Sequence, residues 1–447
     1  MNFEQLKEAL IAAAKKAGLD QYEIYYEKDE NLSVETLKDE INAFSSGVSA
    51  GICFRCVVDG KMGYASGELL TVEAMEDLVL RAISNAKCID SEDAAIIFKG
   101  SEHYETVDLP DPTLADPMEM RRIALEIQKQ TYAVSDKVGD GTQSAMISNV
   151  GEIALYNSNG LDLKNKVGIT AGYAVAIVRD GDEAQEAFSA ASGKTYEDFK
   201  DVSEKAVQKA LDKMGAGLVS SGKYNVVFDG EQFKSFLSTF SSAFSAKNAQ
   251  LGLSLLAGKE GETIAAPCVT IVDDPMREGN PMQTSFDGEG VATYRKNVIE
   301  NGVLKTLLYD LTTATKAGKT STANGRKHGY ASSVSIAPYN FSLCAGDASR
   351  EELMKIAGDG IFVTECKGFH AGANAVTGDF SIESAGFMIR DGKLAEPVKS
   401  FTVAGNFFAL LKEIDRLGDK VLWSPIGGFT SFASPDVLVK GMSVAGK

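Results

Sequence analysis

The segment GVSAGICFRCVVDG, Gly47 to Gly60, decides the fold because it recurs further along the chain as GITAGYAVAIVRDG, Gly168 to Gly181. In both copies an apolar run typical of a β-strand ends at an Asp-Gly pair. Asp-Gly between apolar runs is a strong signal for a two-residue hairpin turn, since such turns need positive φ angles. Both copies therefore predict a β-hairpin.

An amphipathic helix follows each predicted hairpin. After the turn both copies reach a Ser-Gly pair, and helical spacing then begins in VEAMEDLVLRAISNA, residues 72–86, and in VSEKAVQKALDKMGA, residues 202–216. A repeated hairpin and helix implies two similar sheet-and-helix units in one N-terminal domain. With the helix expected at the start of the chain, this domain covers residues 1–215.

The rest of the chain, residues 220–447, is expected to form a β-rich domain. Asn301-Gly302 and Asp391-Gly392 predict further hairpins. Helices are fewer: one is expected in SREELMKIAGDG, with Ser349 as its N-cap, and one in GNFFALLKEIDRLG. Hairpins with segregated helices, without a regular strand–helix alternation, predict an α+β fold with a largely antiparallel sheet.

Composition excludes several classes of function. The 447 residues carry a formal net charge of −17, which would repel a polyanion, so direct nucleic-acid binding is not expected. No apolar run reaches the roughly 18 to 20 residues needed to span a bilayer. Cys53 and Cys56 form a C-x-x-C in an apparent strand, where residues three apart point to opposite faces, so they are expected to be buried structural thiols. These features predict a cytoplasmic protein.

Two polar segments in the C-terminal half are candidates for turns or ligand-binding loops. In FDGEG, residues 286–290, Asp287 and Glu289 are expected to form a solvated acidic turn. Between Gly368 and Ser381, glycines alternate with polar side chains, and backbone could approach a ligand closely there. That segment is equally consistent with a plain long turn.

The stretch FLSTFSSAFSAKN, Phe236 to Asn248, predicts an amphipathic helix. Aromatic and leucine side chains recur at helical spacing on one face, which is expected to pack into the core. The opposite face is expected to carry serines, namely Ser238, Ser241, Ser242 and Ser245. From the residues alone this helix is structural.

The chain resembles the TldD/PmbA family over nearly its whole length. The most specific stretches are FDGEGVATYRKNVIENGVLKTLLYDLTTATKAGKTSTANGRK, GANAVTGDFSIESAGFMIRDGKL and VLVKGMSVAG, in that order. Members of this family form cytosolic zinc-dependent peptidases with a metal-bearing TldD-type subunit and a metal-free PmbA-type subunit, also called TldE. The resemblance implies an N-terminal α+β domain, a β-rich C-terminal domain, and a peptide held in a cleft inside a dimer.

The metal motif of the TldD-type subunit is substituted in this chain. An ungapped alignment places the H-E-x-x-x-H positions at Leu237, Ser238 and Ser242. The family's third ligand, a cysteine near the C-terminus, has no counterpart, since Cys366 is the last cysteine. The resemblance therefore implies a non-catalytic PmbA-type subunit without a catalytic residue, metal or cofactor of its own, which pairs with a zinc-bearing TldD-type subunit.

The resemblance also suggests which residues line the peptide cleft. The candidates are Ser238, Ser242, His370, Asn374 and Asp379. Two alternatives stay open at this point: a homodimeric peptide-binding or interaction protein without peptidase activity, and an autonomous metallopeptidase that uses Cys366, His370 and Asp379 as unconventional ligands. The family's label as modulator of DNA gyrase would describe an indirect effect, given the acidic charge.

Overall fold

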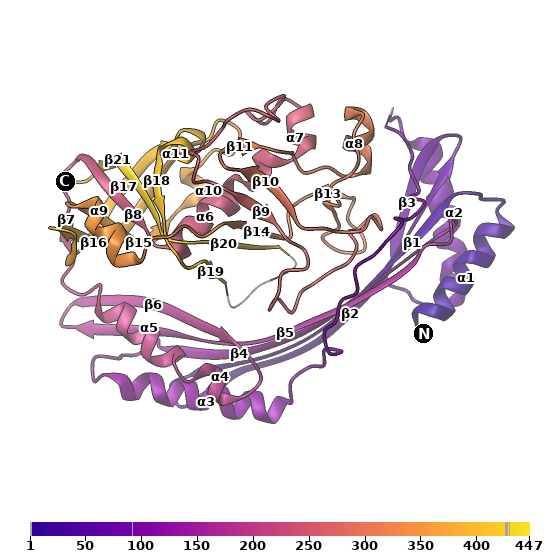
Figure 1. Cartoon of the computed structure of the whole chain (residues 1–447). Coiled ribbons are helices and arrows are strands. Elements are labelled where there is room, and N and C mark those ends of the chain that lie inside the picture. The colour runs from indigo at the N-terminus through magenta and orange to yellow at the C-terminus, as the bar shows by residue number, and fades with distance from the viewer. Residues whose placement is uncertain (1, 92, 425–427, 429) are drawn as a thin grey trace.

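A long antiparallel sheet dominates the first half of the chain in this computed structural model, which describes residues 2–91, 93–424, 428 and 430–447. Six strands form this sheet in the order β3-β2-β1-β4-β5-β6. They are β1 (Tyr22–Leu37), β2 (Glu40–Val58), β3 (Lys61–Gly67), β4 (Gln143–Asn157), β5 (Asp162–Asp180) and β6 (Glu183–Ser192). Figure 1 shows the sheet curving beneath the C-terminal half of the chain.

The strands that precede the two copies of the repeat, β1 and β4, pair at the centre of this sheet. β1 pairs with β4 in antiparallel register from Glu23 opposite Asn157 to Leu37 opposite Gln143. Both predicted hairpins are present, but the second turn is shifted by one residue. β2 turns into β3 through Asp59 and Gly60, which have φ angles of 50° and 75°, whereas Asp180 still belongs to β5 and the chain turns into β6 through Gly181, with a φ angle of 57°, and Asp182. The two units therefore share one continuous sheet.

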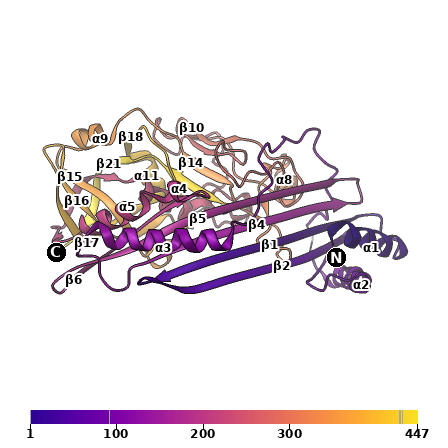
Figure 2. The same cartoon turned by 90° about the horizontal axis from the view of Figure 1, so that it is seen from below.

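Helices cover the outer, convex face of the sheet and leave the concave face to the C-terminal half (Figures 1 and 2). α1 and α2 pack together at one end, and α3 and α5 pack at the other. The bounds are α1 (Phe3–Lys16), α2 (Val72–Cys88), α3 (Pro117–Val134), α4 (Tyr196–Phe199) and α5 (Val202–Leu211). The two helices predicted after the hairpins are thus present as α2 and α5.

The C-terminal half contains a closed ring of five strands. β21 pairs with both β8 and β17, so the strands β21-β8-β15-β16-β17 form a barrel to which β18 and β7 are added at the edges. The bounds are β7 (Gly217–Leu218), β8 (Gly222–Phe228), β15 (Gly360–Lys367), β16 (Asp379–Arg390), β17 (Lys393–Asn406), β18 (Ile414–Leu417) and β21 (Val437–Ala445). Most of these pairings are antiparallel, as predicted.

A second sheet lies beside the barrel in the order β11-β10-β9-β14-β20-β19, and β12 pairs with β13 separately. Its strands are β9 (Ile271–Asp273), β10 (Lys296–Glu300), β11 (Val303–Leu304), β14 (Asn340–Leu343), β19 (Leu422–Trp423) and β20 (Ser431–Ser434); the separate pair is β12 (Gly325–Arg326) and β13 (Ser335–Ile336). One hydrophobic core contains side chains from the barrel, from this sheet and from α6 (Gly230–Phe240). The helix therefore joins the two β-structures.

The aromatic face of α6 is confirmed as core. Phe236 is fully buried, and its ring centroid lies 5.4 Å from that of Phe228 on β8 and 5.0 Å from that of Phe380 on β16. Phe240 stacks on Phe407 at 4.4 Å. These contacts attach α6 to the barrel.

The continuous helix predicted for residues 236–248 is wrong. α6 ends at Phe240, a 3₁₀ turn covers Ser241–Phe244, and a separate helix α7 (Ala246–Gln250) begins at Ser245. The backbone nitrogen of Asn248 donates to the Ser245 hydroxyl, which caps α7, and the Asn248 side chain donates to the carbonyl of Ser242. Such local bonds compete with helix geometry, so Ser245 is buried instead of lying on the polar face.

The other sequence predictions for this half are mostly confirmed. Asn301 and Asp391 adopt positive φ at hairpin turns, and α9 (Arg350–Ala357) begins at its Ser349 cap. α11 (Phe407–Glu413) is shorter than predicted, because the chain from Ile414 onward becomes β18 and pairs with β21. α8 (Leu311–Ala317) and α10 (Phe369–Gly372) complete the helices of the described residues.

Two further expectations concern the cysteines and the membrane. Cys53 and Cys56 are both buried, in separate hydrophobic clusters, as expected for side chains on opposite faces of β2. No helix among the described residues is long and apolar enough to cross a bilayer.

Replacing Phe236 by alanine should destabilise the protein by about 3–5 kcal/mol, because the substitution leaves a cavity among several aromatic rings. Urea-induced unfolding followed by circular dichroism measures the change. Ser238→Ala, on the exposed side of the same helix, is the matched control and should change stability by less than about 0.5 kcal/mol. Equal effects of the two substitutions would contradict the packing described here.

Candidate functional site

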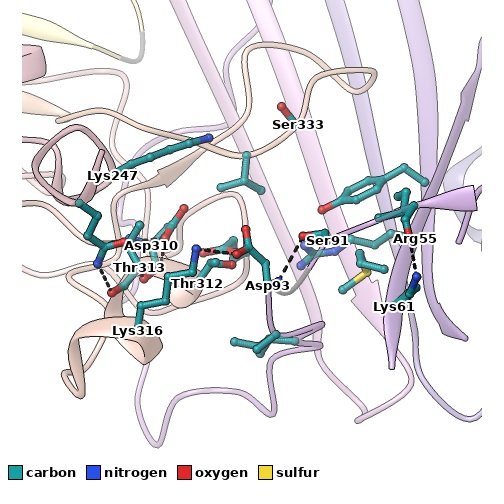
Figure 3. Close-up of a pocket in the computed structure, with 18 of the residues that line it drawn as sticks. Arg55, Lys61, Ser91, Asp93, Lys247, Asp310, Thr312, Thr313, Lys316 and Ser333 are labelled. Carbon is teal, nitrogen blue, oxygen red and sulfur yellow. Dashed lines mark hydrogen bonds and ion pairs between the residues drawn. The ribbon is translucent and has the colours of Figure 1, made fainter. Parts of the chain in front are cut away.

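A cavity of about 700 Å³ lies between the N-terminal sheet and the C-terminal half (Figure 3). β2 and β3 border it on one side, and α8 borders it on the other. Its charged lining residues are Arg55, Lys61, Asp93, Lys247, Glu289, Asp310 and Lys316. Lys316 Nζ lies 2.5 Å from Asp93 Oδ1, so an ion pair connects the two halves across this interdomain cavity.

The turn FDGEG forms part of the cavity wall. The Asp287 carboxylate accepts hydrogen bonds from the backbone nitrogens of Glu289, Val291 and Gly325, at 2.9 to 3.0 Å. The Glu289 carboxylate accepts one from the backbone nitrogen of Leu311, at the start of α8. A Cβ at Gly325 would lie 2.6 Å from Glu289 Oε2, so only glycine leaves room for this carboxyl group.

The prediction of a solvated acidic turn at Asp287 and Glu289 is wrong. Their exposed fractions are only 2% and 4%. Tyr104, from the N-terminal half, donates a hydrogen bond to the carbonyl of Gly290, and the Phe286 side chain packs with Tyr25 of β1. The concave face of the sheet thus covers the turn. The prediction failed because these contacts join residues far apart in sequence, and such contacts cannot be recognised from the local sequence.

Burial governs the electrostatics of this site. The pKa of Glu289 is raised, first because burial disfavours its charged form and second because Asp287 is close; the nearby Arg55 guanidinium opposes the shift. Burial also raises the pKa of Asp287. Arg55 itself is buried on β2 and pairs with Glu23 of β1, with 2.7 Å between Arg55 Nε and Glu23 Oε1. A protonated Glu289 can donate a hydrogen bond to a carbonyl group, such as that of a peptide, in the cavity.

The positions that align with the metal motif lie elsewhere, on and after α6. Leu237 is fully buried in the core, whereas Ser238 and Ser242 are exposed. Because α6 ends at Phe240, Ser242 belongs to the following 3₁₀ turn. The three side chains therefore do not share one surface.

The segment from Gly368 to Ser381 packs beside α6 through Phe369, whose ring centroid lies 4.9 Å from that of Phe236. His370 is exposed on the single-turn helix α10. Asn374 and Asp379 line an open hollow. Asn374 caps its own turn by accepting from the backbone nitrogens of Val376 and Thr377, and Asp379 accepts from the Asn406 side chain.

The structure therefore brings only part of the predicted site together. Asn374 and Asp379 share one hollow, while Ser238, Ser242 and His370 are exposed on neighbouring segments. Burial raises the pKa of Cys366 to about 12, and Cys366 Sγ lies 3.8 Å from Ser384 Oγ. Among the residues that the structure describes, no three His, Cys, Asp or Glu side chains group closely enough to hold a metal ion.

The interdomain cavity was not predicted, although the sequence carries one signal of it. Arg55 is a charged residue within the apolar run GICFRCVV, and a charge in a buried strand requires a partner. That signal identifies a buried ion pair, but it does not identify Glu289 or Lys316, which come from the other half of the chain.

Three models of one protein family match successive parts of the chain. Models of the PmbA/TldA metallopeptidase family match as domain 1 at residues 22–86, as central domain at residues 108–214 and as C-terminal domain at residues 221–446. An uncharacterised Methanocaldococcus jannaschii protein is 31% identical, with 97% of this chain and 98% of that protein covered. The metalloprotease PmbA of Escherichia coli O157:H7 is 23% identical, with 93% and 92% covered.

Solved structures share the fold over the whole chain. A proposed modulator of a DNA gyrase from Thermotoga maritima has a TM-score of 0.89 and 30% identity, with 99% of this chain and 100% of that chain covered. TldE from Thermococcus kodakarensis has a TM-score of 0.88 and 23% identity, with 98% and 100% covered.

The buried acid pair makes stability depend on pH. Because the pKa of Glu289 is higher in the folded than in the unfolded chain, the folded state binds more protons between the usual pKa of 4.5 and about 8, and stability falls as pH rises through that range. The Glu289→Gln side chain stays neutral at every pH. The free energy of unfolding of this variant should therefore fall by on the order of 2 kcal/mol less than that of the parent protein between about pH 5.5 and pH 8.5.

Urea unfolding midpoints at several pH values measure this difference. Glu8→Gln, at an exposed position on α1, is the control and should follow the parent protein. Parallel curves of stability against pH for the parent and Glu289→Gln would show that Glu289 has the same pKa in the folded and the unfolded chain.

Proposed function

The chain belongs to the PmbA/TldA metallopeptidase family, and from this membership we propose that it is the metal-free subunit of a peptidase complex. In this proposal it pairs with a zinc-bearing relative of the TldD type and helps to enclose and hold an extended peptide. The observation that carries the proposal is the set of side chains at the metal-motif positions, Leu237, Ser238 and Ser242.

The chemistry of these side chains supports a non-catalytic role. Catalytic zinc normally takes three protein ligands with nitrogen, sulfur or carboxylate donors, and it lowers the pKa of a bound water. Leucine and serine supply no such donor. Leu237 also points into the core, where it belongs to the hydrophobic cluster around Phe236.

The edge of the N-terminal sheet supports the peptide-holding role. β3 pairs with β2 only from Ile52 to Val58, so residues 40–51 of β2 pair with β1 alone among the described residues. An unpaired strand edge can bind an extended chain through backbone hydrogen bonds with little sequence preference. Further along the same strand, where β2 pairs with β3, Arg55 lines the interdomain cavity.

The same proposal places the complex in the cytoplasm and gives it no direct nucleic-acid partner. A net charge of −17 opposes binding to a polyanion. The Thermotoga maritima relative is described as a modulator of a DNA gyrase. In this proposal, any such effect of the present chain is indirect: it acts through a peptide or protein substrate and not through contact with DNA.

Co-expression with an H-E-x-x-x-H relative from the same organism tests the pairing. Size-exclusion chromatography should give one peak that contains both chains, and peptidase activity should exceed that of either chain alone. A partner with its motif histidines replaced by alanine is the control: it should form the complex and hydrolyse nothing.

The remaining outcomes of the co-expression experiment would favour the two alternative functions. Two separate peaks, with a homodimer of this chain and no gain of activity, would reject the pairing and favour a peptide-binding homodimer. Chelator-sensitive hydrolysis by this chain alone would identify an autonomous metallopeptidase and overturn the proposal.

Hydrogen exchange tests strand addition directly. When the complex binds an unfolded peptide, about every second amide of residues 40–51 should exchange more slowly, because alternate amides of β2 point away from β1. Residues 23–37 of β1 are paired on both sides and serve as the internal control. Unchanged exchange in residues 40–51 would place peptide binding elsewhere.

A further inference from the structure

A second cavity, of about 420 Å³, lies between the concave face of the sheet and the C-terminal half. Asp287 and Gly288 line it, whereas the neighbouring Glu289 lines the interdomain cavity. We call it the Lys327 pocket; its polar and aromatic lining includes Tyr25, Glu27, Asp29, Asp287, Arg326 and Lys327.

Strand β1 supplies one wall. Tyr25, Glu27 and Asp29 alternate along the strand, so they share one face of the sheet. The side chain of Tyr25 packs with Phe286, which shows that this face meets the C-terminal half. Burial and the adjacent Asp29 raise the pKa of Glu27 to about 7, and burial raises the pKa of Asp29.

Two charged side chains in this pocket have unused hydrogen-bonding capacity. Lys327 Nζ is buried 4.2 Å from the Tyr25 ring centroid, and it has no hydrogen-bond acceptor within the described part of the chain. Glu27 Oε2 is buried there without a donor. A buried charged group without a partner is costly, so a group that supplies the missing partner binds favourably.

The neighbouring polar groups are already engaged. The Asp287 carboxylate accepts three backbone N–H groups. Arg326 donates to the carbonyl of Pro338, and its guanidinium lies 3.9 Å from the centroid of the Tyr339 ring. Two groups of the pocket can therefore still accept a hydrogen-bonding partner: the cationic Lys327 and the acidic Glu27. Asp29 lies beside Glu27.

We propose that the Lys327 pocket binds a small zwitterion, namely a free amino acid or a dipeptide. Its carboxylate accepts from Lys327 Nζ, and its ammonium group donates to Glu27 and Asp29. A simple anion would meet the two acids, and a metal ion would meet the lysine, so only a ligand with both charges satisfies both sides. The volume of 420 Å³ lies in the range of about 300–1,000 Å³ typical of small-ligand sites.

This site does not depend on the proposed pairing with a metal-bearing subunit. Its residues all come from this chain, so the isolated protein should bind the ligand even if no complex forms. Failure of the pairing experiment and failure of the binding experiment are therefore separate results.

Isothermal titration calorimetry with L-alanyl-L-alanine tests the proposal on the isolated full-length chain. N-acetyl-alanyl-alanine lacks the ammonium group, and alanyl-alanine amide lacks the carboxylate. Each should bind about tenfold or more weakly than the unmodified dipeptide, because each loses one charge-assisted hydrogen bond. This comparison uses only the parent protein and does not depend on the folding of any variant.

Two substitutions then assign the charges to residues. Lys327→Met should weaken binding of the dipeptide about tenfold or more and leave binding of its amide unchanged. Glu27→Gln should weaken binding of the dipeptide and leave binding of the N-acetyl peptide unchanged. Lys393→Met, at an exposed position on β17, is the matched control and should bind like the parent.

Three results would overturn the proposal. The first is the absence of measurable heat with the dipeptide at millimolar concentration. The second is equal affinity for the dipeptide and both blocked forms. The third is equal loss of affinity for all three peptides in Lys327→Met, since that pattern reports a general structural effect and not recognition of a carboxylate.

Discussion

The antiparallel pairing of β1 with β4 is the constraint on which the rest of the structure depends. It joins the two copies of the repeat over a long register, so that two hairpin units become one curved sheet. Helices fill the convex face, and the concave face is left for the C-terminal half. Both cavities lie on that concave side, and strands of this sheet therefore decide which groups enter them.

Where the halves meet, charged groups are buried beside a small hydrophobic cluster that contains Tyr25 and Phe286. The Glu23–Arg55 pair, the acids of the FDGEG turn and the Lys327 ammonium all lie close to this junction. Buried ionic groups contribute little net stability but strongly disfavour arrangements that leave them unpaired. The junction is thus better suited to fixing one relative placement of the halves, and to recognising polar ligands, than to adding stability.

Much of the fold could be predicted from local signals, while the site could not. Asp59-Gly60 and Asp391-Gly392 encode hairpins because the turn residues themselves need positive φ. The predicted ends of α6 and α11 are wrong, because hydrophobic periodicity carries no information on capping or strand pairing. Ser245 caps the separate helix α7, and Ile414 begins a strand that pairs with β21. Glu289 and Lys327 acquire their surroundings from β1 and β2, hundreds of residues away, and no spacing rule connects them.

The closure of the barrel by β21 has a consequence for biosynthesis. The N-terminal sheet needs only the first 192 residues, so it can form while the ribosome is still translating the remainder. β8 and β17, by contrast, obtain their common neighbour only from residues 437–445, which follow all the other strands of the barrel in sequence. The barrel can close only once these residues have been made, and a chain that stops before them keeps a folded front half with an open, aggregation-prone strand edge behind it.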